Sequence, residues 1–205
     1  MKMNINMKKI VFFLLVQFVT LGAFAQEATI KEAEVAYTKE DYGKAIELYQ
    51  RWSSYEAEDG VVVVYASMYG NTAKMADYIA HKIADAGVKQ IRVHDVSKTH
   101  ISYLINDIWR FKGVVLGSCA YNTQMFPLME SLTRELVHIG VKNRYLGLFG
   151  SYSWNGGGVK NLKLFADEIG WEQVAEPAEI MGRPACDKYA ACDALAAGMA
   201  GKLQH

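Results

Sequence analysis

Three polar side chains follow an apolar run in the part of the chain best suited to bind a ligand. Residues 61–66 read Val-Val-Val-Val-Tyr-Ala, which predicts a strand buried on both faces. Ser67, Asn71 and Thr72 come next, and a helical spacing of apolar residues starts at Thr72. A strand, a tight loop and a helix in this order expose backbone N–H groups at a helix N-terminus, which stabilise an anion.

The composition of this loop narrows the choice of anion. It holds no lysine or arginine and lacks both Gly-x-x-x-x-Gly-Lys-Ser/Thr and Gly-x-Gly-x-x-Gly, so neither a triphosphate nor a dinucleotide is expected. Neutral donors of this kind suit one terminal phosphate. The alternative is an ordinary helix cap that binds nothing, since Ser, Asn and Thr are common capping residues.

Apolar strands alternate with helical patterns after residue 60, which is typical of a parallel sheet covered on both faces. We expect strands over residues 61–66, 90–95, 113–117, 145–149 and 172–181. We expect helices over residues 72–86, 102–109, 127–139, 159–169 and 186–203. Right-handed crossovers then predict an α/β fold, with a doubly wound five-stranded parallel sheet in the order 2-1-3-4-5.

Ligands bind at the carboxyl ends of the strands in such a sheet, where the winding direction reverses. The loops after the first, third and fourth expected strands therefore meet there. The second of these loops carries Tyr121, and the third carries Tyr152 and Trp154 among glycines. Beside a phosphate site, these aromatic rings suit a flat ring system held by stacking. The alternative is that they simply cover the end of the sheet.

The three loops together resemble those of flavodoxins. Residues 67–72 read Ser-Met-Tyr-Gly-Asn-Thr and resemble the flavodoxin phosphate loop, while residues 117–122 and 149–157 are similar to the loops that hold the flavin ring. The strongest resemblance, over residues 61–203, is to the flavodoxin domain at the C-terminus of flavodiiron proteins. It implies a flavodoxin-like fold with FMN as the cofactor.

The resemblance also implies which residues bind FMN. The hydroxyl and amide side chains of the first loop would hold the phosphate, and Met68, Tyr121 and Trp154 would lie beside the isoalloxazine. Backbone groups of the other two loops would meet the polar edge of the ring and the ribityl chain. The full set of expected cofactor-binding residues is Ser67, Met68, Tyr69, Gly70, Asn71, Thr72, Ser118, Cys119, Ala120, Tyr121, Asn122, Gly150, Ser151, Tyr152, Trp154, Asn155, Gly156 and Gly157.

The chain departs from flavodiiron proteins in its metal-binding pattern. Those proteins carry an N-terminal lactamase-like domain with a His/Glu/Asp iron site, but no His-x-Glu-x-Asp-His occurs here and the 5 histidines are scattered. Reduction of oxygen or nitric oxide at iron is therefore not expected. No metal site and no catalytic nucleophile–base set stand out. Cys119 is expected to be a small loop residue rather than a reactive thiol.

The N-terminal residues have other patterns. Residues 1–25 combine a basic start, an apolar run and a small-x-small site, which predicts a cleaved signal peptide and export to the periplasm or the exterior. The alternatives are a cytoplasmic protein and an uncleaved anchor, for which the apolar run is short. Residues 26–59 are expected to be a helical segment and linker that resembles part of one tetratricopeptide repeat, and residues 27–52 could contact a partner. Residues 60–205 form the expected flavodoxin-like domain.

Charge and composition limit the function. The 205-residue chain has 22 basic and 22 acidic residues, which argues against nucleic-acid binding. We rank first an FMN-binding electron carrier that passes electrons between redox partner proteins. Second is an FMN-dependent NAD(P)H:quinone or flavin oxidoreductase, which needs room for nicotinamide that Trp154 and Tyr121 are expected to restrict. Third is a non-redox partner-binding module that uses residues 27–52.

Overall fold

The computed structural model describes Gly43, residues 56–185 and residues 188–204 of the chain. The expected signal peptide, residues 1–25, lies outside the described residues. So does the repeat-like segment, apart from Gly43 and residues 56–59. Within the part of the chain that is described, no helix is both long and apolar enough to cross a membrane.

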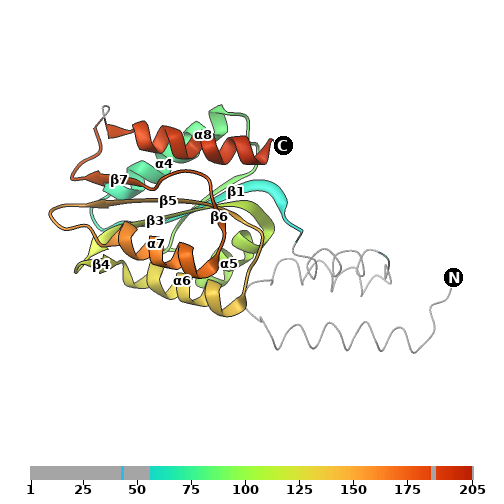
Figure 1. The fold of residues 1–205 in the computed structure, drawn as a ribbon, viewed down its shortest axis with the longest axis horizontal. Helices are drawn as coiled ribbons and strands as arrows, with labels where there is room; N and C mark the ends of the chain where they lie inside the picture. The colour runs from blue at the N-terminus through green and yellow to red at the C-terminus, as the bar shows by residue number, and fades with distance from the viewer. Residues whose placement is uncertain (1–42, 44–55, 186–187, 205) are drawn as a thin grey trace.

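A mostly parallel sheet forms the middle layer of the structure (Figure 1). Neighbouring strands in the order β2-β1-β3-β5-β6 all pair in parallel, so the prediction of an α/β fold with a parallel sheet is confirmed. The strands of the described residues are β1 (Glu58–Ala66), β2 (Ile91–Asp95), β3 (Phe111–Tyr121), β4 (Gln124–Met125), β5 (Tyr145–Tyr152), β6 (Glu172–Gln173) and β7 (Ala178–Met181).

The predicted number of five strands is wrong, because the described residues contain a 7-stranded sheet. The strand expected over residues 172–181 is divided into β6 and β7, which both pair with β5. Pro177 lies between them, and proline has no N–H to donate to a neighbouring strand. The other additional strand, β4, folds back antiparallel onto the end of β3. The predicted order 2-1-3-4-5 is kept along the path β2-β1-β3-β5-β6, because β5 and β6 correspond to the fourth and fifth expected strands, and β4 and β7 are additional strands beside this path.

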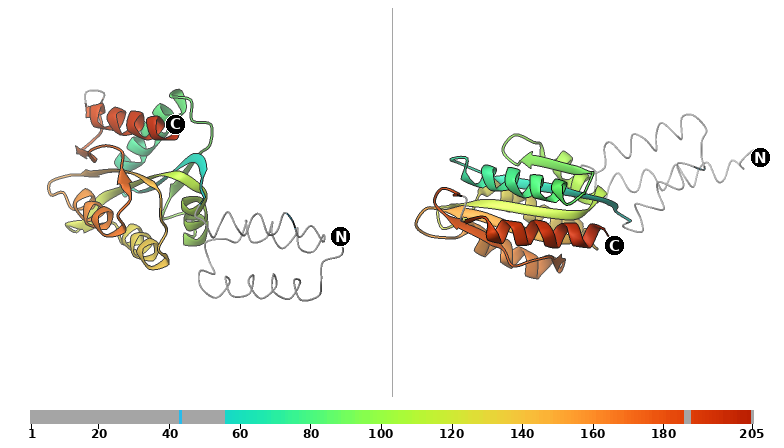
Figure 2. Two further views of the ribbon diagram at one scale, coloured as in Figure 1. Left: turned by 45° about the vertical axis from the view of Figure 1, so that its right-hand side comes forward. Right: turned by 90° about the horizontal axis from the view of Figure 1, so that it is seen from above.

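Helices cover both faces of this sheet. On one face, α4 (Asn71–Asp85) and α8 (Ala190–Leu203) lie side by side. The other face is covered by α5 (Ile101–Arg110), α6 (Pro127–Ile139) and α7 (Gly158–Ile169). The views in Figures 1 and 2 show these layers from different sides.

The side chains of β1 are divided between the two cores. Val61 and Val63 pack with residues of α4 and α8, whereas Val62 and Val64 pack with residues of α5, α6 and α7. All four valines are fully buried. A slip of one residue would exchange the two sets of side chains, so packing on both faces fixes the register of β1.

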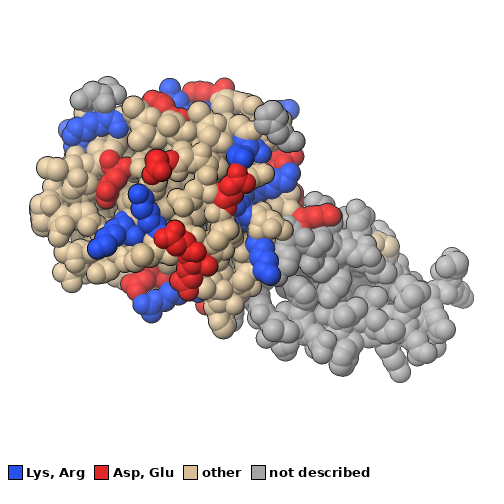
Figure 3. Space-filling model, viewed as in Figure 1, with Lys and Arg blue, Asp and Glu red and all other residues tan. Residues whose placement is uncertain are grey.

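Charged residues extend β1 beyond its apolar run. The strand begins at Glu58, before the expected start at residue 61, and pairs there with the start of β3. The Arg110 guanidinium lies 3.0 Å from a carboxylate oxygen of Glu58, and Lys112 Nζ lies 2.6 Å from one of Asp59. Figure 3 shows that charges of both signs are mixed on the face of the molecule that it presents.

Gly117 of β3 makes room for an aromatic ring directly below the strand ends. A Cβ built at Gly117 would lie 2.1 Å from the ring of Phe149, which is fully buried. This contact is much closer than two carbon atoms can approach, so a side chain at position 117 must displace the ring.

We expect Gly117→Ala to lower the free energy of unfolding by about 1–3 kcal/mol through overpacking. Chemical denaturation measures the change. Gly201→Ala is the matched control, since Gly201 lies in α8 and its added Cβ would meet no atom within 4 Å beyond its own helix backbone and chain neighbours. That control should unfold at the same or a higher denaturant concentration, because alanine is the better helix former. A Gly117→Ala protein as stable as wild type would contradict the packing described for Phe149.

Candidate functional site

The loops after β1, β3 and β5 meet at one rim of the sheet. Parallel pairing places Ala66 opposite Ser118 and Cys119 opposite Ser151 at the ends of these strands. Between the loops lies a cavity of about 480 Å³, which we call the slot. Its wall is formed by Ser67, Met68, Tyr69, Asn71, Thr72, Cys119, Ala120, Tyr121, Asn122, Thr123, Ser151, Tyr152, Ser153, Trp154 and Asn155.

Most of the residues expected to bind a cofactor therefore lie in one wall. Thr123 and Ser153 also line the slot, although they were not in the expected set. Ser153 lies between two expected residues, Tyr152 and Trp154, so its position alone was a signal for including it. Thr123 lines the slot because it lies in the turn between β3 and β4, which the sequence did not predict. The expected residues that are not part of the wall are Gly70, Ser118, Gly150, Gly156 and Gly157.

The N-terminus of α4 forms one end of the slot. Gly70 precedes the helix with a left-handed φ of 81°, and no side chain caps the helix. Ser67 Oγ instead accepts a hydrogen bond of 3.1 Å from the Gly70 N–H, which leaves the Ser67 hydroxyl proton for another acceptor. The first turn of α4 holds no acidic residue. The uncapped N–H groups and the helix dipole therefore favour an anion at this end.

Two buried hydroxyls join the first loop to the third. Thr72 Oγ1 and Ser151 Oγ lie 2.8 Å apart, and either oxygen can donate the hydrogen bond. Thr72 is fully buried and Ser151 is 7% exposed, so this bond is shielded from bulk water. It ties the first turn of α4 to the end of β5.

The second loop is a tight hairpin. β3 pairs with β4 as far as Tyr121 and Gln124, which leaves Asn122 and Thr123 as a two-residue turn. Both turn residues have positive φ angles, 48° and 63°, as a type I′ turn requires. A β-branched residue such as threonine rarely adopts this conformation, so contacts elsewhere must stabilise the turn.

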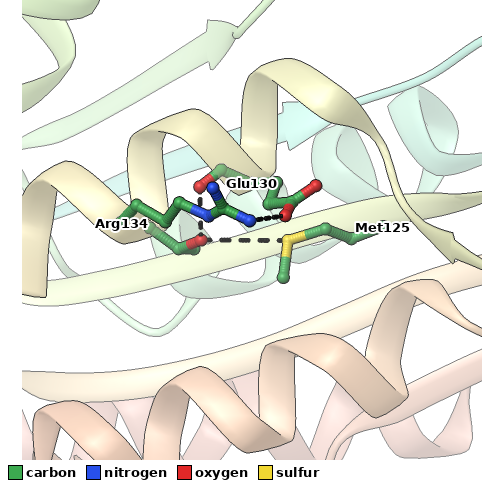
Figure 4. A network of polar contacts seen from close by, with 4 residues as sticks. Met125, Glu130 and Arg134 are labelled. Carbon is green, nitrogen blue, oxygen red and sulfur yellow. Dashed lines mark hydrogen bonds and ion pairs between the residues drawn. The ribbon is translucent and has the colours of Figure 1, made fainter.

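Those contacts come from both sides of the hairpin. A Cβ on Gly157 would lie 2.1 Å from the carbonyl oxygen of Thr123, so only glycine lets the turn approach the start of α7 this closely. On the outer side, Thr133 Oγ1 of α6 lies 3.9 Å from the sulfur of Met125 and 2.9 Å from the carbonyl oxygen of Glu130 (Figure 4). The hairpin is thus held between α6 and α7.

Large apolar side chains at the slot are exposed to solvent. Trp154 is 91% exposed, Tyr69 is 83% exposed, and Met68 and Tyr121 are each 43% exposed. Apolar side chains that gather in this way around a cavity mark a binding surface. In Figure 3 the left-hand end of the molecule, where β4 and the β5–α7 loop lie in Figure 1, is mostly free of charge.

The wall of the slot is neutral. None of the described residues that line it carries a charge at neutral pH. The carboxylate of Glu179 lies outside the wall, 3.0 Å from the position of a Cβ on Gly156, and burial raises the pKa of this carboxyl while Lys163 opposes the shift. The polar atoms of the wall belong to hydroxyls, amides and backbone, which suits a ligand whose charge is confined to the α4 end.

Among residues 56–185 and 188–204, no group of three or more His, Cys, Asp or Glu side chains is placed to hold a metal ion. Two histidines in this part of the chain bond to nearby protein groups. His94 Nε2 lies 2.7 Å from a carboxylate oxygen of Asp107, and His100 Nδ1 accepts a hydrogen bond from the Ser102 N–H at the start of α5.

Cys119 lies in the slot wall but is only 8% exposed. Burial raises the pKa of its thiol, against the opposite effect of hydrogen bonding to the backbone of Met68. The thiol is therefore protonated at neutral pH, when it is a poor nucleophile.

We expect iodoacetamide to modify Cys119 of the folded protein near neutral pH at least about ten-fold more slowly than in the unfolded chain, because the thiolate is the reactive form. Mass spectrometry of the peptide containing Cys119 measures the rate. The same reaction in denaturant is the control. In the folded protein the rate should rise only at a pH above the ordinary thiol value of about 8.5. Equal rates in the two states would show that the Cys119 thiol is as accessible and as readily ionised as in the unfolded chain.

Comparisons with known proteins agree with this geometry. The flavodoxin family model matches residues 63–193. The anaerobic nitric oxide reductase flavorubredoxin of Escherichia coli O1:K1 / APEC is 31% identical over 128 residues, which are 62% of this chain and 27% of that protein. The protein of the same name from Pectobacterium carotovorum subsp. carotovorum is 32% identical over 136 residues, 65% of this chain and 27% of that protein. The chain thus spans about a quarter of the length of these relatives, 27% in both cases.

Solved structures show the same fold. Rubredoxin oxygen:oxidoreductase from Desulfovibrio gigas superposes with a TM-score of 0.77 at 24% identity, over 80% of this chain and 41% of that chain. A flavodoxin from the domain Archaea superposes with a TM-score of 0.62 at 25% identity, over 71% of this chain and 99% of that chain. The predicted flavodoxin-like fold is therefore confirmed. With a family match that covers more than half of its length, the chain belongs to the flavodoxin family.

Proposed function

We propose that this chain holds FMN in the slot and passes electrons between redox partner proteins. Proteins of the flavodoxin family bind FMN. The observation that supports the proposal most is that the slot joins an uncapped helix N-terminus to a set of exposed aromatic rings. FMN is divided in the same way, with a phosphate at one end and a flat ring at the other.

The size of the slot and the types of its polar groups fit FMN. Its volume of about 480 Å³ lies within the range of about 300–1,000 Å³ of small-molecule and cofactor sites. The wall combines apolar and aromatic side chains with hydroxyl and amide groups on each of the three loops. A few placed polar groups within a mostly apolar lining are typical of a site that orients its ligand.

At the α4 end, Ser67, Asn71 and Thr72 would hold the phosphate together with the first N–H groups of the helix. The Ser67 hydroxyl can donate to it, since its oxygen already accepts from Gly70. With no cationic side chain in the wall, these donors and the helix dipole supply the attraction. Hydrogen bonds to a charged group contribute about 1.5–3 kcal/mol each, so the phosphate should provide a large part of the affinity.

At the other end, Tyr121 and Trp154 would stack on the isoalloxazine, with Met68 close by. Bound FMN supplies one- and two-electron redox chemistry, which the protein's own side chains need not provide. The chain's own residues would bind and orient the ring, and the 91% exposure of Trp154 places this side of the slot at the protein surface. An open edge is what a docking redox partner requires.

A second candidate is an FMN-dependent NAD(P)H:quinone or flavin oxidoreductase. We expected Trp154 and Tyr121 to restrict the space over the ring. Trp154 is 91% exposed and has little contact with the rest of the protein, so its side chain can move aside, whereas Tyr121 is 43% exposed and packs edge-on against Phe126. This exposure favours room for a second substrate. The partner-binding module through residues 27–52 and export through residues 1–25 stay predictions, because they depend on residues outside those described.

We expect the full-length protein to bind one FMN and to bind riboflavin at least about ten-fold more weakly, because riboflavin lacks the phosphate, whose contacts exceed about 1.4 kcal/mol. Quenching of flavin fluorescence in a titration gives both dissociation constants. Trp154→Ala should weaken the binding of both FMN and riboflavin by about 2–10-fold, because stacking on the indole ring is lost. Tyr103→Ala is the control, because Tyr103 is 58% exposed but lies outside the slot wall.

If the wild-type protein binds neither flavin, both the electron-carrier and the oxidoreductase proposals are contradicted. Equal affinity for FMN and riboflavin would contradict the phosphate site alone. With flavin bound, steady-state NADPH oxidation in the presence of a quinone separates the two candidates: turnover supports the oxidoreductase, and reduction only through an added redox protein supports the carrier.

A further inference from the structure

The hydrogen bond between Thr72 and Ser151 connects the first loop of the binding site to the third. It joins residues 79 positions apart in the sequence, at a distance of 2.8 Å. Thr72 stands in the first turn of α4, where the phosphate is proposed to bind, and Ser151 stands near the end of β5. Both residues line the slot and are at least nine-tenths buried.

The number of protons on the two hydroxyls limits what the pair can do. Each hydroxyl has one proton and can also accept. One proton lies between the two oxygens, and the other is left for a different acceptor. If Ser151 donates to Thr72, the proton of Thr72 is available at the N-terminus of α4. If Thr72 donates to Ser151, it has no proton left for a ligand there.

An ionised phosphate oxygen can only accept, so it selects the first arrangement. A hydroxyl that accepts one hydrogen bond also becomes a better donor, because neighbouring hydrogen bonds polarise each other. Within the slot wall no charged side chain competes with the phosphate for these protons, since the described residues that line it are neutral.

We propose that Ser151 is a positioning residue for the phosphate: it donates its hydrogen bond to Thr72 Oγ1 and so directs the Thr72 proton to the ligand. Ser151 thereby contributes to the preference for a phosphorylated flavin through Thr72. This inference rests on the proposed function, because it assumes that the flavin phosphate lies at the start of α4. A merely structural tie between α4 and β5 would instead affect phosphorylated and unphosphorylated flavins equally.

The test compares Ser151→Val with Ser151→Thr in the full-length protein. The two side chains have the same shape and both suit a β-strand, but only threonine can donate. Titrations with FMN and with riboflavin give the ratio of the two affinities for each variant. We expect Ser151→Thr to keep the wild-type ratio within about two-fold. Ser151→Val should reduce the ratio by about 5–10-fold, with the same riboflavin affinity in both variants.

A double-mutant cycle identifies the group through which Ser151 acts. Thr72→Val removes the hydroxyl that donates to the phosphate. In that background, Ser151→Val should leave the ratio of FMN to riboflavin affinities unchanged within about two-fold, since the proton to be directed no longer exists. A further fall in the ratio would overturn the inference, because Ser151 would then contact the phosphate by a route of its own.

The outcomes separate this inference from the proposed function. If the wild-type protein binds neither flavin, both the proposed function and this inference are wrong. Wild-type protein that prefers FMN, with equal ratios in Ser151→Val and Ser151→Thr, overturns only the role of Ser151. A parallel loss of FMN and riboflavin affinity in Ser151→Val also overturns it, in favour of a structural tie. If a variant does not fold, Ser151→Ala compared with wild type replaces the pair, with the same two flavins and the same criteria.

Discussion

The parallel pairing of β1, β3 and β5 is the constraint on which the site depends. Strands that run in the same direction must release their following loops at the same rim, and the register places Ala66 opposite Ser118 and Cys119 opposite Ser151. Packing on both faces fixes this register, because a slip of one residue would exchange the side chains of the two cores. The uncapped start of α4, the hairpin after β3 and the loop before α7 are all positioned by these strand ends.

The walls of the slot are built by close backbone approach and buried hydroxyls rather than by charged side chains. Gly157 lets the start of α7 contact the turn at Thr123, where any Cβ would lie 2.1 Å from a carbonyl oxygen. The bond between Thr72 and Ser151 ties the start of α4 to the end of β5. The attraction for an anion then comes from the N–H groups and the dipole of α4, which act at one end only. This leaves the aromatic end neutral, as a stacked ring requires.

The sequence was informative where local chemistry decides the structure. Alternating strand and helix patterns predicted the parallel sheet, and α6 runs from Pro127 to Ile139 and stops at the left-handed Gly140 as the spacing indicates. Tertiary contacts decided the rest. Thr123 adopts a positive φ that its β-branched side chain opposes, because the hairpin is held between α6 and α7. The contact between Thr72 and Ser151 spans 79 residues and has no sequence pattern. The division of the last expected strand does have a sequence signal, Pro177, but the apolar residues around it favoured a single continuous strand.

A crystal structure of the protein with FMN tests the central claim most directly. The account predicts that the phosphate lies at the N-terminus of α4, within hydrogen-bond distance of Thr72, and that the ring lies beside Tyr121 and Trp154. FMN bound elsewhere, or bound in the slot with its phosphate directed away from α4, would contradict it.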